Sequence, residues 1–196
     1  MKEPILYRTV RPMITFLMKV LYRPTISGRK NIPTEGSIVL AGNHTNDFDP
    51  VLLFSSTKRT IHFLAKDSLL KGWKKIIFAN LGLIPVDRSR QTNQEVVESA
   101  IKILEHKRVI GIFPESTINR AKEDYTLPFK TGAVRMCAAT GATIVPFVIT
   151  GEYKIFRKRV RIDFLEPYKI TGDIEEENQK LREIISSWIK NKQEEK

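Results

Sequence analysis

The most informative part of this chain is the stretch Ile38-Val39-Leu40-Ala41-Gly42-Asn43-His44-Thr45-Asn46-Asp47-Phe48-Asp49-Pro50. Its first five residues form an apolar run that predicts a buried strand. His44 follows that strand in a loop, and functional side chains are often carried by loops on a rigid scaffold. Asp49 lies at a His-x4-Asp spacing and can accept a hydrogen bond from the imidazole, which fixes the tautomer that a histidine general base requires. Because this spacing also arises by chance, its weight depends on motifs further along the chain.

The composition is that of one globular domain. The chain has 196 residues, of which 41% are hydrophobic and 28% charged, so it can bury one sizeable core. The formal charge of +11 favours anionic partners, namely nucleic acid, anionic lipid or an acidic carrier protein. The single cysteine, Cys137, excludes an intrachain disulfide and indicates a reducing compartment. It lies in an apolar helical run, which favours a position in the core.

Short apolar runs alternate with segments of helical periodicity. Strands are predicted at residues 37–41, 62–65, 84–86, 109–113, 144–149 and 160–164, and helices at 50–56, 69–80, 93–106, 131–140 and 174–192. This alternation predicts an α/β fold, a single domain with a mixed, largely parallel sheet flanked by helices. His44, Arg88 and Glu115 each follow a predicted strand at its C-terminal end, so we expect them to share one cleft.

Residues 1–23 have an amphipathic pattern. On a helical wheel one side carries basic and polar residues and the other bulky apolar ones: Arg8, Arg11, Thr15, Lys19 and Arg23 against Leu6, Val10, Met13, Ile14, Phe16, Leu17, Val20 and Leu21. Such a helix lies in a membrane interface or, alternatively, docks its apolar face on its own domain. The sequence contains neither a long uncharged apolar stretch nor a signal-peptide pattern, so the expected attachment is peripheral, at the cytoplasmic face of the cell membrane.

Three further blocks carry polar side chains after apolar runs. Gly82-Leu83-Ile84-Pro85-Val86-Asp87-Arg88 ends in a guanidinium that suits a phosphate, unless Arg88 is an ordinary surface side chain. Phe113-Pro114-Glu115-Ser116-Thr117 positions a carboxylate that either binds substrate or stabilises a turn. Phe129-Lys130-Thr131-Gly132-Ala133 opens a predicted helix whose free N–H groups favour a phosphate.

In this order the blocks resemble the glycerolipid acyltransferase family, the PlsC-like 1-acylglycerol-3-phosphate acyltransferases. Asn43-His44 through Asp49 resembles the family's His-x4-Asp block, and Gly82 through Arg88 its second block. Phe113-Pro114-Glu115 opens the third block, Phe-Pro-Glu-Gly-Thr-Arg, and Val145-Pro146 fits the fourth. Phe63, Ala65 and Lys66, ahead of the second block, are also similar. Four ordered blocks are far more specific than any one of them.

The resemblance implies direct transfer of an acyl group from a thioester to the free hydroxyl of 1-acylglycerol-3-phosphate, which gives phosphatidic acid in phospholipid synthesis. It implies His44 as the general base and Asp49 as the residue that orients it. The substrate-binding set that we expect is Arg88, Glu115, Ser116, Thr117, Arg120, Lys130 and Lys66. No cofactor or metal is expected. The donor is acyl-ACP or acyl-CoA. The expected partners are a lysophospholipid, an anionic membrane surface and, where it carries the donor, acyl carrier protein, but no nucleic acid. Residues 24–196 would form the acyltransferase domain.

The third block departs from the family pattern. Ser116 stands where the family usually has Gly, and Ile118 where it has Arg. Ile118 cannot hold a phosphate, so Arg120 or Lys130 is expected to replace the missing Arg. This leaves open another lysophospholipid or glycerol phosphate as the acceptor, as well as the acyl chain length, the donor and the oligomeric state.

Two other classes compete with an acyltransferase. A basic nucleic-acid-binding module would fit the positive charge, but the sequence has no reader motif. A metal-dependent hydrolase using His44 and Asp49 as ligands would need further clustered ligands beside them, and the neighbouring sequence supplies none.

Overall fold

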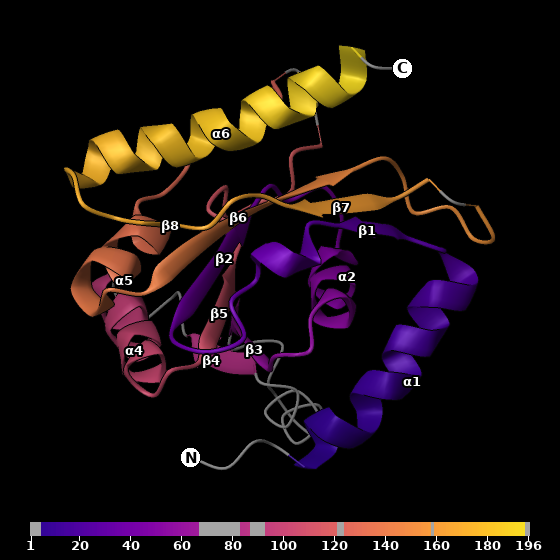
Figure 1. Cartoon of the computed structure of the whole chain (residues 1–196), viewed down its shortest axis with the longest axis horizontal. Helices are drawn as coiled ribbons and strands as arrows, with labels where there is room; N and C mark the ends of the chain where they lie inside the picture. Colours follow the sequence, from indigo (N-terminus) through magenta and orange to yellow (C-terminus); the bar gives the residue numbers. More distant parts are fainter. Residues whose placement is uncertain (1–4, 67–82, 87–92, 121–123, 158, 195–196) are drawn as a thin grey trace.

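The computed structural model describes residues 5–66, 83–86, 93–120, 124–157 and 159–194 (Figure 1). The helices are α1 (Ile5–Leu21), the short 3-10 helix η1 (Arg29–Asn31), α2 (Asp49–Ser56), α4 (Asn93–Glu105), α5 (Gly132–Thr140) and α6 (Ile174–Glu194). The strands are β1 (Thr25–Ser27), β2 (Ile38–Gly42), β3 (Ile61–Lys66), β4 (Leu83–Val86), β5 (Val109–Ile112), β6 (Thr143–Thr150), β7 (Arg161–Phe164) and β8 (Tyr168–Lys169). The helix predicted at residues 69–80 lies outside the described residues.

The strands form one mixed sheet in the order β1-β7-β6-β2-β5-β3-β4, with β8 paired to β6. β2 is central and runs parallel to β5 on one side and β6 on the other. β3 and β4 extend the parallel part, whereas β7 and β8 are antiparallel to β6. The mixed, largely parallel sheet predicted from the sequence is therefore confirmed.

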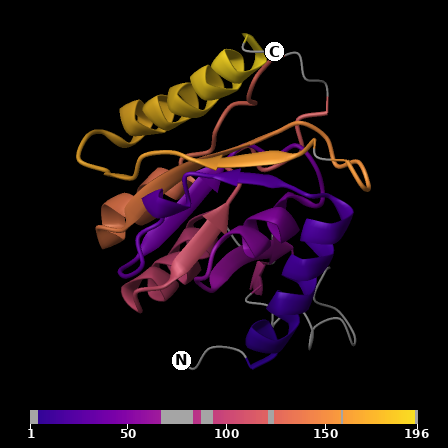
Figure 2. The ribbon, with the colours of Figure 1, turned by 45° about the vertical axis from the view of Figure 1, so that its right-hand side comes forward.

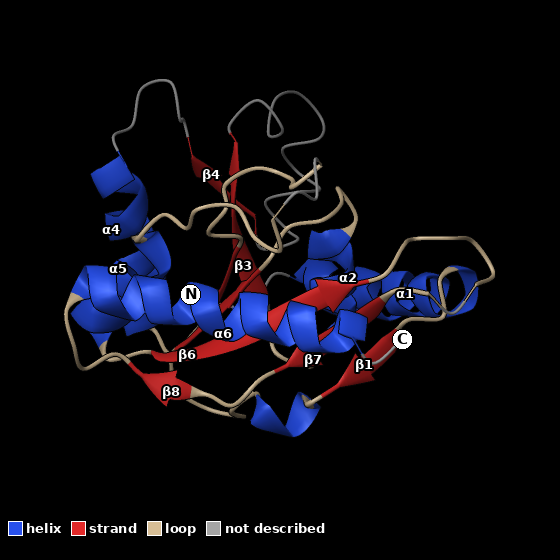
Figure 3. Cartoon of the chain, turned by 90° about the horizontal axis from the view of Figure 1, so that it is seen from above, coloured by secondary structure: helices blue, strands red, loops and turns tan. Residues whose placement is uncertain are grey.

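Helices cover both faces of this sheet, and β2 shows why. Ile38 and Leu40 belong to one buried cluster, which also contains residues of α1 and α2. Val39 and Ala41 belong to the other, which contains residues of α4, α5 and α6. A strand buried on both faces reads as a continuous apolar run, which is the pattern seen in the sequence. Figure 2 shows α1 beside α2, and Figure 3 shows α6 on the other side, lying over β6.

The helix α1 packs against the domain along one stripe. Tyr7 and Met18 are only 2% and 4% exposed and belong to the core. The Tyr7 hydroxyl donates to the carbonyl of Arg59 at 3.2 Å and accepts from the amide of Ile61 at 3.0 Å. The guanidinium of Arg11 donates to the carbonyl of Lys58 at 3.0 Å and to that of Thr57.

The opposite side of α1 leaves bulky apolar side chains in solvent: Met13, Phe16, Leu17 and Val20, which are 57%, 63%, 45% and 43% exposed. Arg11 lies on the side opposite these residues, where the helical wheel places it, but that side faces the domain and its guanidinium contacts the carbonyls of Thr57 and Lys58, which directly follow α2. The helix therefore docks on its own domain through Tyr7 and Met18 and still presents an apolar surface outward. Within the described residues, no helix is both long and apolar enough to cross a bilayer.

The sequence patterns missed two short strands, β1 and β8, which contain three and two residues. Segments this short are below the window in which a period of two can be recognised. β1 is an edge strand held by parallel pairing with β7, from Thr25 opposite Arg161 to Ser27 opposite Asp163. The pairing that defines it involves residues far away in the chain.

Gly42 ends β2 at the point where the chain leaves the sheet. A Cβ added there would lie 2.3 Å from the carbonyl oxygen of Phe147 and 2.4 Å from its ring. Only glycine permits this approach of β2 to β6. The close approach fixes the start of the loop that carries His44.

We predict that Gly42→Ala lowers the free energy of unfolding by about 2 kcal/mol or more, because the added methyl meets a backbone atom that cannot move aside. Gly132→Ala is the matched control, since its Cβ would lie at ordinary van der Waals distances from Met136 Cε, Ile112 Cδ1 and Val97 Cγ2, at 3.8, 3.9 and 4.0 Å. That change should stay within about 1 kcal/mol of the parent. Urea unfolding of the three proteins makes the comparison, and equal stabilities would show that the close approach is not a constraint.

Candidate active site

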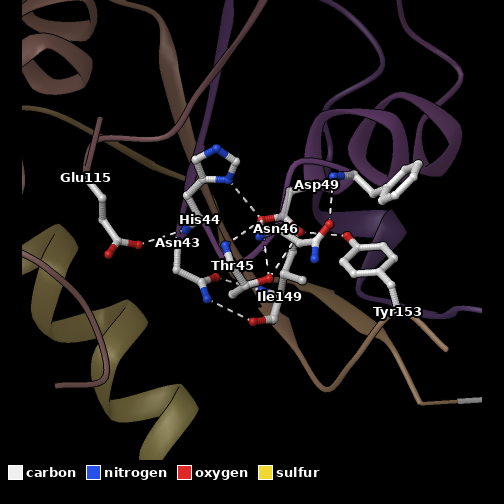
Figure 4. Close-up of polar contacts among 9 residues, drawn as sticks. Asn43, His44, Thr45, Asn46, Asp49, Glu115, Ile149 and Tyr153 are labelled. Carbon is white, nitrogen blue, oxygen red and sulfur yellow. Dashed lines mark hydrogen bonds and ion pairs between the residues drawn. The ribbon is translucent and has the colours of Figure 1, made fainter. Parts of the chain in front are cut away.

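His44 and Asp49 meet at the C-terminal end of β2. Nδ1 of His44 lies 3.0 Å from Oδ2 of Asp49 (Figure 4). An ionised carboxylate only accepts hydrogen bonds, so Nδ1 carries the proton of the neutral ring and Nε2 is left with its lone pair. The side chain of His44 is 17% exposed and that of Asp49 is fully buried. This is the arrangement in which a histidine removes a proton from a substrate.

Asp49 is held by donors from the loop that precedes it. Its Oδ2 accepts the amides of Thr45 at 2.5 Å and Asn46 at 2.8 Å. Its Oδ1 accepts the Thr45 hydroxyl at 3.1 Å. As the first residue of α2, Asp49 also lies where the helix dipole favours a negative charge. These contacts satisfy the acceptor oxygens of a buried carboxylate, which would otherwise be costly to bury.

Tyr153, from the loop between β6 and β7, is the remaining donor. Its hydroxyl donates to Oδ1 of Asp49 at 2.7 Å. Burial, and then the neighbouring Asp49, raises the pKa of Tyr153 far above its usual value, so the phenol remains a donor. The Tyr153 ring contacts those of Tyr22 and Phe48, with centroids 5.7 and 5.9 Å away. These rings fix the hydroxyl on Asp49.

Asn43 and Phe113 fix the rest of the His44 loop. The Asn43 amide group pairs with the backbone of Ile149, donating at 2.8 Å and accepting at 2.7 Å. The Asn43 side chain thus makes the same pair of hydrogen bonds to Ile149 that the backbone of a neighbouring strand residue would make. The Phe113 ring stacks on the His44 imidazole with centroids 4.2 Å apart and planes at 21°. The ring of His44 is thus held from its face as well as by Asp49.

Glu115 ties the third sequence block to His44. Its two oxygens accept the backbone amide of His44 at 2.8 Å and that of Leu127 at 2.7 Å. Burial raises the pKa of Glu115, although the two backbone hydrogen bonds oppose that shift. The residue is 5% exposed, and these contacts are with the chain itself. A direct contact of Glu115 with substrate remains a prediction.

The other residues of this block lie close by. The amide of Asn119 donates to the His44 carbonyl at 3.0 Å, so residues 113–119 run against the His44 loop. Ser116 has φ = 60°, a left-handed conformation that explains why the related family favours Gly there. Thr117, Arg120 and Lys130 are exposed. Their roles in binding remain predictions.

The side chains of two predicted binding residues, Arg88 and Lys66, are not among those described. Arg88 lies outside the described residues. Lys66 ends β3, and only its backbone is described there. The expected cleft shared by His44, Arg88 and Glu115 is therefore established only for His44 and Glu115, which meet through a backbone amide.

Two contacts of Asp49, with Thr45 and with Tyr153, were not predicted from the sequence. Thr45 lies four residues before Asp49, a spacing at which side chain and backbone often bond locally, so a signal existed. Tyr153 lies 104 residues from Asp49, and its neighbouring sequence carries no sign of the contact.

A cleft of about 910 Å³ borders the His44 loop. Its lining includes His44, Glu115, Tyr153, Arg161 and Lys192, contributed by the His44 loop, the third block, the β6–β7 loop, β7 and α6. In the described part of the chain, no three His, Cys, Asp or Glu residues gather as a metal site. Cys137 is buried in α5, and burial raises the pKa of its thiol to about 12, so it is not a thiolate nucleophile.

The comparisons with known proteins agree with this geometry. Residues 23–150 match the family model named Acyltransferase, and the chain belongs to that family. The predicted family resemblance is therefore confirmed. The crystal structure of the 1-acyl-sn-glycerophosphate acyltransferase PlsC from Thermotoga maritima superposes with a TM-score of 0.75 at 20% identity, covering 96% of this chain and 78% of that one. This similarity shows a common fold.

Two curated relatives are both named 1-acyl-sn-glycerol-3-phosphate acyltransferase. The protein of Borreliella burgdorferi is 33% identical over 137 residues, which are 69% of this chain and 54% of that protein. The protein of Bacillus subtilis is 29% identical over 128 residues, 64% of this chain and 62% of that protein. The chain thus spans little more than half the length of these relatives.

We predict that Tyr153→Phe lowers kcat about fivefold to twentyfold with little change in KM, because Asp49 loses one charge-assisted hydrogen bond. Asp49→Asn should lose at least about 100-fold, because an amide donor then faces backbone donors and cannot stabilise the imidazolium. Steady-state acyl transfer measures both. Tyr22→Phe is the control, and it should stay within about twofold of the parent. Equal effects of the two Phe substitutions would contradict the role of the Tyr153 hydroxyl.

Proposed function

We propose that this chain transfers an acyl group from an acyl thioester to the free hydroxyl of 1-acylglycerol-3-phosphate and so makes phosphatidic acid. The observation that carries the proposal is the 3.0 Å contact between His44 Nδ1 and the buried Asp49. This contact supports His44 as a general base, in a chain that belongs to the acyltransferase family. The names of the two curated relatives support this acceptor.

The proposed mechanism is a single transfer. Nε2 of His44 takes the proton of the acceptor hydroxyl while its oxygen attacks the thioester carbonyl carbon. Asp49 stabilises the imidazolium that forms. The tetrahedral intermediate collapses, the carbon–sulfur bond breaks, and the imidazolium proton passes to the leaving thiolate. This scheme gives no acyl-enzyme, in agreement with a site whose described side chains include no thiolate beside His44.

The proposed acceptor site uses cationic side chains around the third block. We assign the phosphate to Arg88, with either Arg120 or Lys130 replacing the Arg that the family has at the position of Ile118. Lys66, Ser116 and Thr117 complete the proposed binding set. The contacts of Glu115 with the amides of His44 and Leu127 support a role in positioning the loop around the acceptor.

The proposed setting is the cytoplasmic face of the cell membrane, because the acceptor is a lipid. The exposed apolar side chains of α1 and the formal charge of +11 support peripheral contact with an anionic surface. The donor is proposed as acyl-ACP or acyl-CoA. Both carry the same thioester, which is the only part of the donor that the His44 mechanism requires.

A second acceptor is favoured by one observation. Ile118 stands where the third block of the family has an Arg, and the loss of this cation weakens the expected binding of a terminal phosphate. Another lysophospholipid, or glycerol phosphate, is therefore the alternative acceptor. Labelled lysophosphatidic acid, other lysophospholipids and glycerol phosphate should be offered with each donor, and the products identified by mass. Phosphatidic acid as the preferred product supports the proposal, whereas transfer only to another acceptor overturns it.

We predict that His44→Ala lowers transfer by about 10²- to 10⁴-fold, the usual contribution of a general base. The folded state should survive because the ring is partly exposed and its removal leaves the Asn43 and Glu115 contacts intact. Circular dichroism and the labelled product assay provide the two readouts. A folded variant with near-normal turnover would contradict the mechanism.

We predict that Arg88→Ala raises KM for the phosphate-bearing acceptor, with a loss of about one to two decades in kcat/KM, because a charge-assisted hydrogen bond is removed. Arg120→Ala should act similarly only if Arg120 replaces the cation missing at position 118. Arg135, exposed on α5, provides the control Arg135→Ala. Unchanged acceptor kinetics in both test variants would mean that the phosphate binds elsewhere.

A further inference from the structure

The connection between β6 and β7, residues 151–160, combines apolar and basic side chains. Its centre reads Lys154-Ile155-Phe156-Arg157-Lys158-Arg159. Ile155 is 57% exposed and Phe156 is 66% exposed, among the most exposed large apolar side chains of the described residues. Lys154, Arg157 and Arg159 are exposed too. We call residues 151–160 the β6–β7 loop.

The shape of this loop is defined by backbone contacts. Gly151 has φ = 83°, and a Cβ there would lie 1.7 Å from the carbonyl oxygen of Arg159, so the two ends of the loop touch. Thr150 pairs with Arg161 directly below them. The amide of Arg157 donates to the Lys154 carbonyl at 3.1 Å. The loop is therefore a closed hairpin end that projects Ile155 and Phe156 at its tip.

Phe156 occupies a left-handed conformation with φ = 58°, which is rare for a bulky side chain. Its amide donates to the carbonyl of Leu21 at 2.5 Å, at the C-terminal end of α1. That bond satisfies one of the carbonyls that a helix end leaves free. The backbone conformation of Phe156 is therefore unfavourable, and it is not offset by burial of the side chain, because the aromatic ring lies in solvent.

The loop lies next to the C-terminal end of α1, whose exposed side carries apolar side chains. The two segments lie side by side in Figures 1 and 2, and the contact between Phe156 and Leu21 joins them. Leu17 and Val20, in the last turns of α1, are 45% and 43% exposed. Lys19 and Arg23 are exposed beside them. Apolar side chains from two separate segments are therefore surrounded by cations.

We propose that the β6–β7 loop is a second membrane-docking element, which inserts Ile155 and Phe156 into the interface of an anionic bilayer beside α1. Apolar side chains flanked by Lys and Arg are complementary to an anionic bilayer, whose interior is hydrocarbon and whose headgroups are negatively charged. The inference builds on the proposed function, because a lipid acceptor requires the enzyme to reach the bilayer. An acidic carrier protein would be attracted by the same cations, but the exposed Ile155 and Phe156 favour lipid.

The loop also reaches the active site. Three residues before Phe156, Tyr153 donates to Asp49 and packs against Tyr22, which directly follows α1. Glu152, Tyr153 and Lys154 line the cleft beside the His44 loop. Docking at the tip therefore sets that cleft against the bilayer, at a fixed distance from the lipid acceptor.

The test uses the full chain and co-sedimentation with vesicles that contain either phosphatidylcholine alone or phosphatidylcholine with phosphatidylglycerol. The double variant Ile155→Ser with Phe156→Ser should lower the partition coefficient on anionic vesicles by at least about tenfold, because two apolar side chains no longer enter the interface. Ile155→Leu with Phe156→Leu keeps the apolar tip and should stay within about threefold. Binding is measured without turnover, so its outcome is independent of the proposed acyl transfer.

Two further measurements sharpen the test. Arg157→Gln with Arg159→Gln should weaken binding to anionic vesicles only, whereas Lys102→Gln with Arg135→Gln, exposed on other helices, should not. Phe156→Trp should add fluorescence that brominated acyl chains quench. Partition of the Ser variant equal to that of the parent, or no added quenching, would overturn the proposal. The proposal would also be overturned if the double Ser variant bound vesicles normally but bound acyl carrier protein more weakly than the parent. That result would make the loop a binding site for the carrier protein.

Discussion

The structure depends on one buried charge, the carboxylate of Asp49. A fully buried carboxylate is costly unless donors surround it, and here the donors come from three places. Thr45 and Asn46 supply backbone amides, the first turn of α2 supplies a favourable dipole, and Tyr153 supplies a hydroxyl from a distant loop. The imidazole of His44 takes the remaining place. The chemistry of the site follows from this arrangement, since Nε2 is the only ring nitrogen left to accept a proton.

The sheet brings His44, Glu115 and Tyr153 together. β2 carries His44 at its C-terminal end, β5 leads to Phe113 and Glu115, and β6 leads through Ile149 to Tyr153. Because these three strands are neighbours and parallel, their C-terminal ends meet at one edge. Gly42 allows β2 to end close to β6, and the Asn43 side chain then replaces the next pair of ladder hydrogen bonds.

Much of this could be predicted from the sequence because the signals were local. The run 38–42 predicted a buried strand, and the His-x4-Asp spacing predicted a pair whose members lie 3.0 Å apart in the structure. Ser116 and Ile118 marked departures from the family pattern, and the left-handed backbone at Ser116 accounts for the Gly that the family usually has there. Contacts across the chain could not be predicted: Tyr153 with Asp49, Glu115 with the His44 amide, and Arg11 with the Lys58 carbonyl all depend on tertiary pairing. The roles of Arg88 and Lys66 still rest on the family resemblance.

The central claim is that Asp49 fixes His44 in one tautomer with Nε2 as the base. Nitrogen-15 NMR of the imidazole side chains measures this directly, and the chain has only three histidines, so His44→Gln assigns the signal. We expect neutral His44 to be protonated at Nδ1, with that state lost or mixed in Asp49→Asn. A neutral His44 protonated mainly at Nε2 in the parent protein would contradict the account.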